Sequence, residues 1–379
     1  MSVYESAVRP LLFRLDAERA HNLTLGAAEL GGRSSVVRRA AGKAFTLNDP
    51  RLHTSLAGLP LSNPLGLAAG FDKNARAVRM LGALGFGHIE IGSVSADASD
   101  GNPKPRLFRV PQDEAIVVAY GVPNEGAHAV RERLAGPRRV PVGVNLVKTN
   151  DPAKPANGPE VYEDYAASFA VLQDRADYIA LNLSCPNSAA DRDFFDELPR
   201  IDALLARLVQ EDPRVPLILK LKPTRDAGVL REIVAIADGH PFVSGFAINL
   251  PSGKPDFLKV TVARDSLEKL PGAVGGPPVE DFVNAILGTL KSITQDRYAL
   301  IAAGGVTTAE AAYTKLQLGA TAVQLYTGLV YHGPTLNKQI LSGLLELMER
   351  DGYSGVAQIS ASRSTATSAA SARTATGSI

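Results

Sequence analysis

Short apolar runs, separated by polar or glycine-rich turns and helical stretches, follow one another along the chain from about residue 65. Each run is too short for a typical helix, is nearly continuously apolar, and ends in Gly, Asn, Ser or Lys, which is typical of parallel strands covered on both faces. The runs span residues 65–70, 88–94, 140–146, 177–184, 216–222, 245–250, 299–305 and 322–328. Because the pattern occurs eight times, it predicts an α/β fold, a closed (β/α)8 TIM barrel. An open doubly wound sheet is the alternative that the pattern leaves open.

The residues ahead of the first run have the spacing of amphipathic helices instead. Apolar residues recur at helical intervals within 3–15, and Asp16 is placed to cap a second helix over about 17–30. We therefore expect a small N-terminal two-helix extension over residues 1–45, followed by the barrel over residues 46–350.

Two further segments have distinct compositions. Residues 52–61, which contain Gly58 and Pro60, predict a short hairpin that closes the bottom of the barrel. Beyond residue 355 the chain consists mainly of Ser, Ala, Thr and Gly, so it cannot bury enough apolar surface to offset its ordering entropy. We expect residues 356–379 to form a disordered tail.

The bulk composition excludes several classes of function. The 40 Lys and Arg residues nearly balance the 39 Asp and Glu residues, so no basic field is present that would hold a nucleic acid. No stretch has the length needed to span a bilayer, and the N-terminus lacks the pattern of a signal peptide. The one cysteine, Cys185, excludes an internal disulfide and a multi-cysteine metal site. The chain is therefore expected to be cytoplasmic, with no metal and no nucleic-acid partner.

Glycines follow the last two predicted strands. Gly304 and Gly305 end the seventh run, and Gly328 ends the eighth. Their backbone amides carry no side-chain obstruction at the place where barrels commonly bind a phosphate. This predicts a phosphorylated cofactor or substrate, although the same glycines would also suit tight turns.

Lysines lie at or just beyond three of the predicted strands. Lys73, Lys148 and Lys220 are placed at the ends of the first, third and fifth runs, so they are expected to converge on the face where barrels carry active sites. Lys220 closes a buried apolar run, and its charge therefore needs an anionic or strongly accepting partner. Such a ring of positive charge suits an anionic or electron-accepting group.

The segment from Asn182 to Asn187 combines two amides, a thiol and a proline at the end of the fourth predicted strand. Amides bind carbonyl and imide groups, and a thiol can remove a proton. A lone cysteine is more often a buried structural residue. Because Cys185 stands between polar residues at a strand end, we interpret it as a catalytic base.

These segments, taken in order, resemble the dihydroorotate dehydrogenase family, and in particular its quinone-linked class 2 members, over about residues 4–347. The resemblance is carried by residues 12–21, 63–73, 104–109, 182–187 and 324–328. It implies an FMN-dependent enzyme of pyrimidine biosynthesis that oxidises dihydroorotate to orotate and passes the electrons to quinone. Cys185 would remove a C–H proton while hydride goes to flavin N5. The N-terminal extension would contact the inner (cytoplasmic) membrane as a peripheral surface and admit the quinone.

The resemblance also implies which residues form each site. FMN would be bound by Ala69, Gly70, Ser93, Asn145, Lys220, Gly276, Gly304, Gly305, Tyr326 and Thr327, with the phosphate on the last four. The substrate would be bound by Lys73, Asn124, Asn182, Asn187 and Asn249. The quinone channel would be lined by His21, Arg109 and Tyr326.

The sequence departs from the class 2 pattern at several positions. Cys185 stands where class 2 enzymes carry serine, and a thiol with a pKa of ~8.5 is a better base near neutral pH than an unassisted hydroxyl. Residues 118–124 replace an Asn-Arg-Met-Gly-Phe-Asn-Asn run, which puts Val118 in place of a substrate-binding asparagine. Leu250 replaces a hydroxyl residue beside Asn249. These changes indicate a less polar substrate pocket.

Three functions therefore stay open. The first is a dihydroorotate dehydrogenase with a divergent pocket. The second is a paralogue that desaturates a different, less polar carbonyl or ring substrate by the same flavin chemistry. The third is a catalytically silent flavin-binding barrel, which requires Cys185 to be idle.

Overall fold

The computed structural model describes residues 2–154, 157–184 and 193–360. Within these residues, eight parallel strands close into a barrel in the order β10-β12-β13-β3-β4-β7-β8-β9. The strands are β3 (Leu65–Leu67), β4 (His88–Val94), β7 (Val142–Leu146), β8 (Tyr178–Asn182), β9 (Leu217–Leu221), β10 (Val243–Ile248), β12 (Ala299–Ala302) and β13 (Ala322–Leu325). Seven of the apolar runs contain one strand each, and the run 245–250 overlaps β10, which begins two residues earlier. The predicted (β/α)8 barrel is confirmed, and the open sheet is excluded by the pairing of β10 with both β9 and β12.

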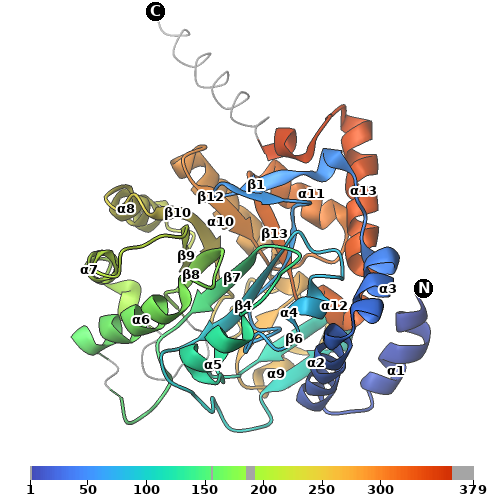
Figure 1. Cartoon of the computed structure of the whole chain (residues 1–379), viewed down its shortest axis with the longest axis horizontal. Coiled ribbons are helices and arrows are strands. Elements are labelled where there is room, and N and C mark those ends of the chain that lie inside the picture. The colour runs from blue at the N-terminus through green and yellow to red at the C-terminus, as the bar shows by residue number, and fades with distance from the viewer. Residues whose placement is uncertain (1, 155–156, 185–192, 361–379) are drawn as a thin grey trace, which may run out of the picture.

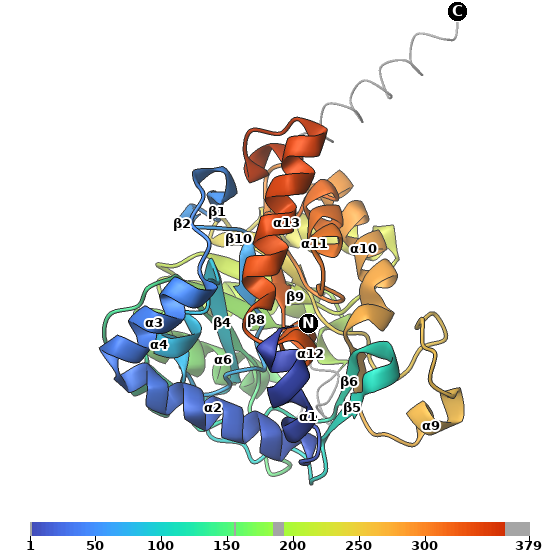
Figure 2. The ribbon, with the colours of Figure 1, turned by 90° about the vertical axis from the view of Figure 1, so that its right-hand side faces the viewer.

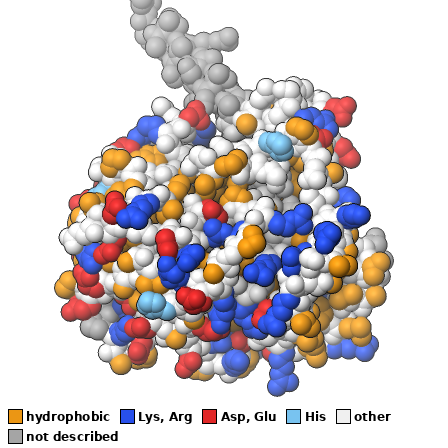
Figure 3. All heavy atoms as spheres, viewed as in Figure 1, with side chains coloured by type: hydrophobic (Ala, Val, Ile, Leu, Met, Phe, Trp, Pro, Cys, Tyr) orange, Lys and Arg blue, Asp and Glu red, His pale blue; other side chains and the backbone are white. Residues whose placement is uncertain are grey.

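Helices surround the barrel and connect its strands (Figure 1). They are α4 (Val78–Leu81), α5 (Gly126–Arg133), α6 (Pro159–Leu172), α7 (Pro199–Val209), α8 (Ala227–Asp238), α9 (Arg264–Glu268), α10 (Glu280–Thr294), α11 (Ala309–Gln317), α12 (Thr327–His332) and α13 (Leu336–Asp351). Helix α7 illustrates the pattern, because Ile201, Leu204, Leu205 and Leu208 are buried at intervals of three and four residues. One apolar stripe of the helix therefore faces the strands. Figure 3 shows Lys, Arg, Asp and Glu side chains interspersed over the surface of one side of the molecule.

The hairpin expected at the bottom of the barrel is present. Strands β1 (Thr54–Leu56) and β2 (Leu59–Leu61) pair antiparallel. Leu56 and Leu61 are buried against the apolar side chains that fill the barrel interior. The hairpin lies at the end of the barrel opposite α1 and α2, so it leaves the C-terminal ends of the strands accessible (Figure 1).

The N-terminal extension contains one helix more than the sequence suggested. Its elements are η1 (Tyr4–Val8), α1 (Arg9–Leu12), α2 (Ala17–Arg33) and α3 (Ser35–Phe45). Asp16 caps α2 as predicted, since its carboxylate accepts a hydrogen bond from the backbone N–H of Arg19 at 3.0 Å. Ser34 separates α2 from α3 and caps the latter. Figure 2 shows α1 and α2 on the side of the molecule that also carries β5 and β6.

A small antiparallel sheet that the sequence analysis did not predict stands above the C-terminal face of the barrel. It consists of β5 (Leu107–Val110), β6 (Ala115–Val118) and β11 (Ala273–Gly275), with β6 in the middle. Short 3-10 turns complete the description: η2 (Pro50–Leu52), η3 (Pro111–Asp113), η4 (Phe194–Asp196) and η5 (Pro277–Val279). The sheet and the N-terminal helices together cover the face on which barrels carry active sites.

The expected C-terminal tail begins with a packed turn. Residues 356–360 are helical, and Val356 and Ile359 are buried in the main core. These two apolar side chains, three positions apart, are enough to hold the turn against the barrel, although the sequence around them contains few large residues. Residues 361–379 lie outside the described residues.

Candidate active site

A cavity of about 890 Å³ opens at the C-terminal ends of the barrel strands. Ala69, Gly70 and Lys220 line it on one side, and Asn249 lines it from the end of β10. Val118 and Leu250, the two positions at which the sequence departs from the class 2 pattern, also line this cavity. The predicted loss of polar groups therefore falls on the wall of the cavity itself.

The phosphate end of this cavity is formed by bare backbone. Gly276, Gly304 and Gly305 have φ values of 111°, 87° and 78°, in the region that favours glycine. A Cβ at Gly305 would lie 2.6 Å from the Cβ of Glu280, which is closer than side chains allow. Thr327 begins α12 at the same wall. These residues leave space and backbone N–H groups for an anion, so they fit the predicted phosphate.

Three amide side chains and one hydroxyl, from the ends of four strands, form a continuous chain of hydrogen bonds beside the cavity. Asn249 donates to the side-chain oxygen of Asn182 at 2.8 Å, and Asn182 donates to Ser93 Oγ at 3.3 Å. Ser93 in turn donates to the side-chain oxygen of Asn145 at 2.5 Å. The structure thus brings together four residues that were assigned separately to the flavin and the substrate, and the hydrogen bonds orient the three amides relative to one another.

Glu90, which the sequence analysis missed, lies at the end of this chain. Its carboxylate has no exposed surface and accepts hydrogen bonds from Asn145, Tyr178 and Gln324, each at 3.1 Å. It is also paired with Lys220 at 3.3 Å. Burial acts to raise the pKa of Glu90, but Lys220 and the hydrogen bonds outweigh burial and hold this pKa below its ordinary value. Glu90 is the anionic partner that Lys220 was expected to need.

Lys73 lies at the edge of the cavity without a carboxylate within ion-pair distance among the described residues. Its Nζ donates to the backbone oxygen of Gly70 at 2.9 Å and lies 3.7 Å from the centroid of the Tyr120 ring. Burial lowers the pKa of Lys73 to about 8, against the attraction of Glu18. The side chain is therefore positively charged at neutral pH and still able to pair with an anion.

One predicted site residue, Asn124, is not brought into this arrangement, and two others cannot be placed because they are outside the described residues. The amide of Asn124 is used within its own turn, where it accepts from the N–H of Ser95 and Gly126 and donates to Ser95 Oγ. Cys185 and Asn187 lie outside the described residues. Their roles stay predictions, supported by the position of Ser184, whose backbone oxygen accepts a hydrogen bond from Asn249.

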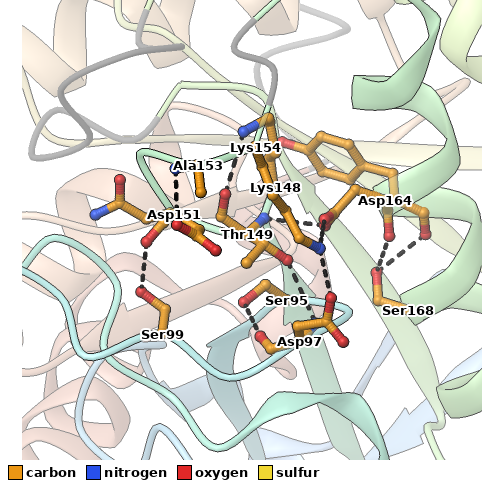
Figure 4. A network of polar contacts seen from close by, with 12 residues as sticks. Ser95, Asp97, Ser99, Lys148, Thr149, Asp151, Ala153, Lys154, Asp164 and Ser168 are labelled. Atoms are coloured by element: carbon orange, nitrogen blue, oxygen red, sulfur yellow. Dashed lines mark hydrogen bonds and ion pairs between the residues drawn. The ribbon is translucent and has the colours of Figure 1, made fainter.

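Lys148, the third predicted lysine, belongs to a separate polar network rather than to the described lining of the cavity (Figure 4). Its Nζ donates to the backbone oxygen of Thr149 at 3.1 Å. Thr149 in turn donates its backbone N–H to Asp164, and Lys154 pairs with both Asp164 and Asp97. These contacts tie the loop around Asp97 to α6. Lys148 follows β7 at the expected end of the barrel, but it does not line the larger cavity.

A second cavity, of about 530 Å³, lies between the N-terminal helices and the small sheet. His21, Arg109 and Tyr326, the three residues assigned to a quinone channel, all line it. The rest of its wall is mainly apolar and includes Phe13 and Leu107. Burial lowers the pKa of His21 to about 3, so its imidazole is neutral at physiological pH.

The two cavities share part of their walls. Ile116 from β6 and Tyr326 from the end of β13 line both of them. The Tyr326 hydroxyl is buried and has no hydrogen-bond partner among the described residues. A group bound in the larger cavity would therefore be one side chain away from a molecule in the smaller one, and it would offer Tyr326 a partner.

Two kinds of feature are absent from the described residues. No group of three or more His, Cys, Asp or Glu side chains in 2–154, 157–184 and 193–360 could hold a metal ion. In the same ranges, no helix has both the length and the apolar character needed to cross a bilayer.

Comparison with known proteins gives a consistent result. Residues 51–348 match the family described as dihydroorotate dehydrogenase. The chain is 38% identical over 358 residues to a protein of Natronomonas pharaonis named dihydroorotate dehydrogenase (quinone), covering 94% of this chain and 98% of that protein. It is 38% identical over 367 residues to a protein of the same name from Acidithiobacillus ferrooxidans, covering 92% and 97%. Among solved structures, DHODH from Eimeria tenella in complex with ferulenol is 26% identical with a TM-score of 0.77, covering 90% of this chain and 94% of that one.

Proposed function

The chain belongs to the dihydroorotate dehydrogenase family, and from this premise we propose that it oxidises dihydroorotate to orotate with FMN and passes the electrons to a quinone. The observation that carries the proposal is the pair of cavities with a common wall at Ile116 and Tyr326. The larger cavity has a glycine-lined end, and Lys220 and Asn249 add polar groups to its wall. The other is mainly apolar and suits a lipid-soluble acceptor. The relatives favour dihydroorotate over the other substrates that the sequence left open.

Residues of the larger cavity would hold FMN. Its phosphate would lie on the backbone of Gly276, Gly304 and Gly305 and on Thr327, where a Cβ would fill the space. Its ring would lie beside Lys220, the amide chain that includes Ser93 and Asn145, and the strand end at Ala69 and Gly70. When bound there, FMN supplies the two-electron redox chemistry of the reaction.

The protein's own residues would bind, orient and deprotonate the substrate. Lys73 would pair with the substrate carboxylate, since its ammonium contacts a backbone oxygen and a ring face and has no carboxylate partner among the described residues. Asn182 and Asn249, whose amides are already held together at 2.8 Å, would orient the carbonyl and imide groups of the ring. Cys185, as thiolate, would take the proton from the carbon next to the carbonyl. Asn187 and Asn124 are kept as further predicted substrate contacts.

The smaller cavity would admit the quinone. A neutral His21 can donate a hydrogen bond to a quinone carbonyl, and the Arg109 guanidinium would add a second polar contact at the same apolar wall. Arg109 is held in place by the backbone oxygens of Leu12 and Leu15 in the N-terminal extension. The extension therefore forms one side of the route to the cavity.

We further propose that the N-terminal helices contact a membrane surface. Among the described residues, all strongly exposed large apolar side chains except Val209 lie between residues 3 and 37. They are Val3, Val8, Leu11, Leu15, Leu23, Leu30, Val36 and Val37. Exposed apolar side chains on the helices that line an apolar cavity suit a peripheral protein whose substrate dissolves in lipid. Sedimentation with phospholipid vesicles tests this, and binding that is unchanged when Leu23, Leu30 and Val36 are replaced by Ser would contradict it.

The experiment that tests the enzymatic proposal is anaerobic reduction of the purified yellow protein by (S)-dihydroorotate in a stopped-flow instrument. Bleaching of the flavin band that added quinone reverses supports the proposal. A flavin band that dihydroorotate leaves intact would overturn it. The matched variants are Cys185→Ala, which should lose reduction by at least about a thousandfold, and Cys185→Ser, which should retain a slower reaction at neutral pH.

A further inference from the structure

Tyr120 presents the face of its ring to the ammonium of Lys73. The Nζ atom lies 3.7 Å from the ring centroid, and it also donates to the backbone oxygen of Gly70 at 2.9 Å. Both Tyr120 and Gly70 line the larger cavity. A ring face and a carbonyl hold a cation in place without neutralising it. The charge of Lys73 therefore stays available to an anion that enters this cavity.

The ring itself is fixed on its other sides. Tyr120 is 6% exposed and packs in an apolar cluster with Leu107 and Ile116. The guanidinium of Arg106 lies 5.5 Å from the same ring centroid. Arg106 is in turn paired at 3.0 Å with Glu18 of α2, a buried carboxylate. Because its neighbours are buried and paired, the ring cannot turn away from Lys73 without disrupting them.

We propose that Tyr120 is a positioning residue that fixes the Lys73 ammonium for the anionic group of the substrate, and so determines the preference of this cavity for acidic substrates. This rests on the proposed function, in which that group is the carboxylate of dihydroorotate. Tyr120 acts through Lys73 rather than on the reacting atoms. Loss of the ring face is expected to weaken binding of an acidic substrate by roughly three- to thirtyfold, the range of a partly to fully buried cation–π contact.

Loss of the ring face also changes the protonation of Lys73, because the contact favours the charged form. The groups that face this ammonium are Asp72 on its own loop, Glu18 and His21 on α2, and Arg106. His21 is neutral throughout the useful pH range, since burial lowers its pKa to about 3. The pKa of Lys73, about 8 in the intact protein through burial, is expected to fall further when the ring is removed.

The test compares Tyr120→Leu and Tyr120→Phe in the FMN-loaded full chain. The pKa of Lys73 is measured by competitive acetylation at graded pH followed by peptide mass spectrometry, which needs no substrate. KM and kcat for dihydroorotate are measured in parallel. Tyr120→Leu should lower the pKa of Lys73 and raise KM about tenfold, with a smaller change in kcat. Tyr120→Phe keeps the ring face, so Lys73 should keep its wild-type pKa in this variant.

Controls separate positioning from general damage. Tyr298→Leu removes another tyrosine that lies under an arginine, Arg297, away from both cavities, and should leave the pKa of Lys73 in place. If Tyr120→Leu fails to bind FMN, Tyr120→Met, which also lacks a ring face, replaces it. An unaltered pKa and KM in the Leu or Met variant would overturn the proposal, as would a Phe variant that behaves like Leu. Wild-type flavin that dihydroorotate does not reduce would overturn the proposed function instead, and the acetylation result would still decide the role of Tyr120.

Discussion

The ammonium of Lys220 lies 3.3 Å from the carboxylate of Glu90, a side chain with no exposed surface in the centre of the barrel. The pair places a compensated positive charge at the floor of the larger cavity, where an isolated lysine would be costly to bury. The carboxylate also accepts hydrogen bonds from three neutral side chains, those of Asn145, Tyr178 and Gln324. The floor of the cavity is therefore a complete polar network rather than a single ion pair.

Replacing Glu90 by Gln should be strongly destabilising. The change leaves the ammonium of Lys220 without its anionic partner in a buried site, which typically costs about 3–5 kcal/mol. The free energy of unfolding by urea checks this, together with the FMN content of the purified protein, which should fall. Glu163→Gln removes a surface ion pair with Arg207 and should cost under about 1 kcal/mol. Equal stability of the two variants would contradict the role assigned to Glu90.

Replacing Gly305 by Ala should reduce FMN retention. The residue has φ of 78°, and a Cβ would lie 2.6 Å from the Cβ of Glu280, so the loop must shift to accept it. The backbone conformation alone costs about 1–3 kcal/mol. Gly253→Ala is the matched control, because Gly253 has φ of 65° and open space around its Cβ position. The ratio of bound FMN to protein should fall in the first variant and not in the second.

Replacing His21 by Ala should separate the two half-reactions. The imidazole lines the smaller cavity and stacks on Tyr326 with a centroid distance of 6.3 Å. Reoxidation of the reduced protein by quinone should slow by about tenfold, because a hydrogen-bond donor and a wall of the cavity are lost. Reduction by dihydroorotate should change by less than twofold. Stopped-flow measurement of each half-reaction checks this, and an equal loss in both would show that His21 acts on the larger cavity instead.

Acid should destabilise the protein through its buried histidines. Burial lowers the pKa of His21 to about 3 and that of His88 to about 4. As pH falls below about 6.5, the unfolded chain binds protons that the folded chain does not bind until pH 3–4. The free energy of unfolding therefore has its full value above pH 6.5 and decreases as the pH falls, by at most about 1.4 kcal/mol per pH unit for each histidine.

The variant His21→Phe tests this dependence. It removes one of the two groups, so the free energy of unfolding should fall less steeply between pH 6.5 and pH 4 than in the wild type. His128→Phe changes an exposed histidine and should keep the wild-type slope. A His21→Phe slope that matches the wild type would mean that His21 is accessible to protons in the folded state.

Local patterns were sufficient to predict the barrel, because each strand carries its own signal. Each run, such as 216–222, is apolar along its length since both faces are covered, and a glycine or polar residue marks its end. The order of strands then follows from the connection rules of parallel β/α units. Loop glycines 304 and 305 were informative for the same reason, since only glycine suits both the backbone angle and the space there.

Features that depend on distant segments were missed. Strand β6 pairs with β11, which comes much later in the chain, and neither segment is long enough to be recognised alone. Glu90 was hidden in an apolar run, although a charged residue in the middle of a buried strand is itself a signal that a partner must exist. The hydrogen bonds of the Asn124 amide with Ser95 and Gly126 were not predicted either, and the assignment of Asn124 to the substrate stays a prediction. Which partner an amide takes is decided by the loop's packing.

The common wall formed by Ile116 and Tyr326 has a consequence for how the reactants meet. A water-soluble acid in the larger cavity and a lipid-soluble acceptor in the smaller cavity would occupy separate spaces, so they would not compete for one binding site. The two reactants would then be separated by a wall that is one side chain thick. Electrons need to cross that wall, while neither reactant does.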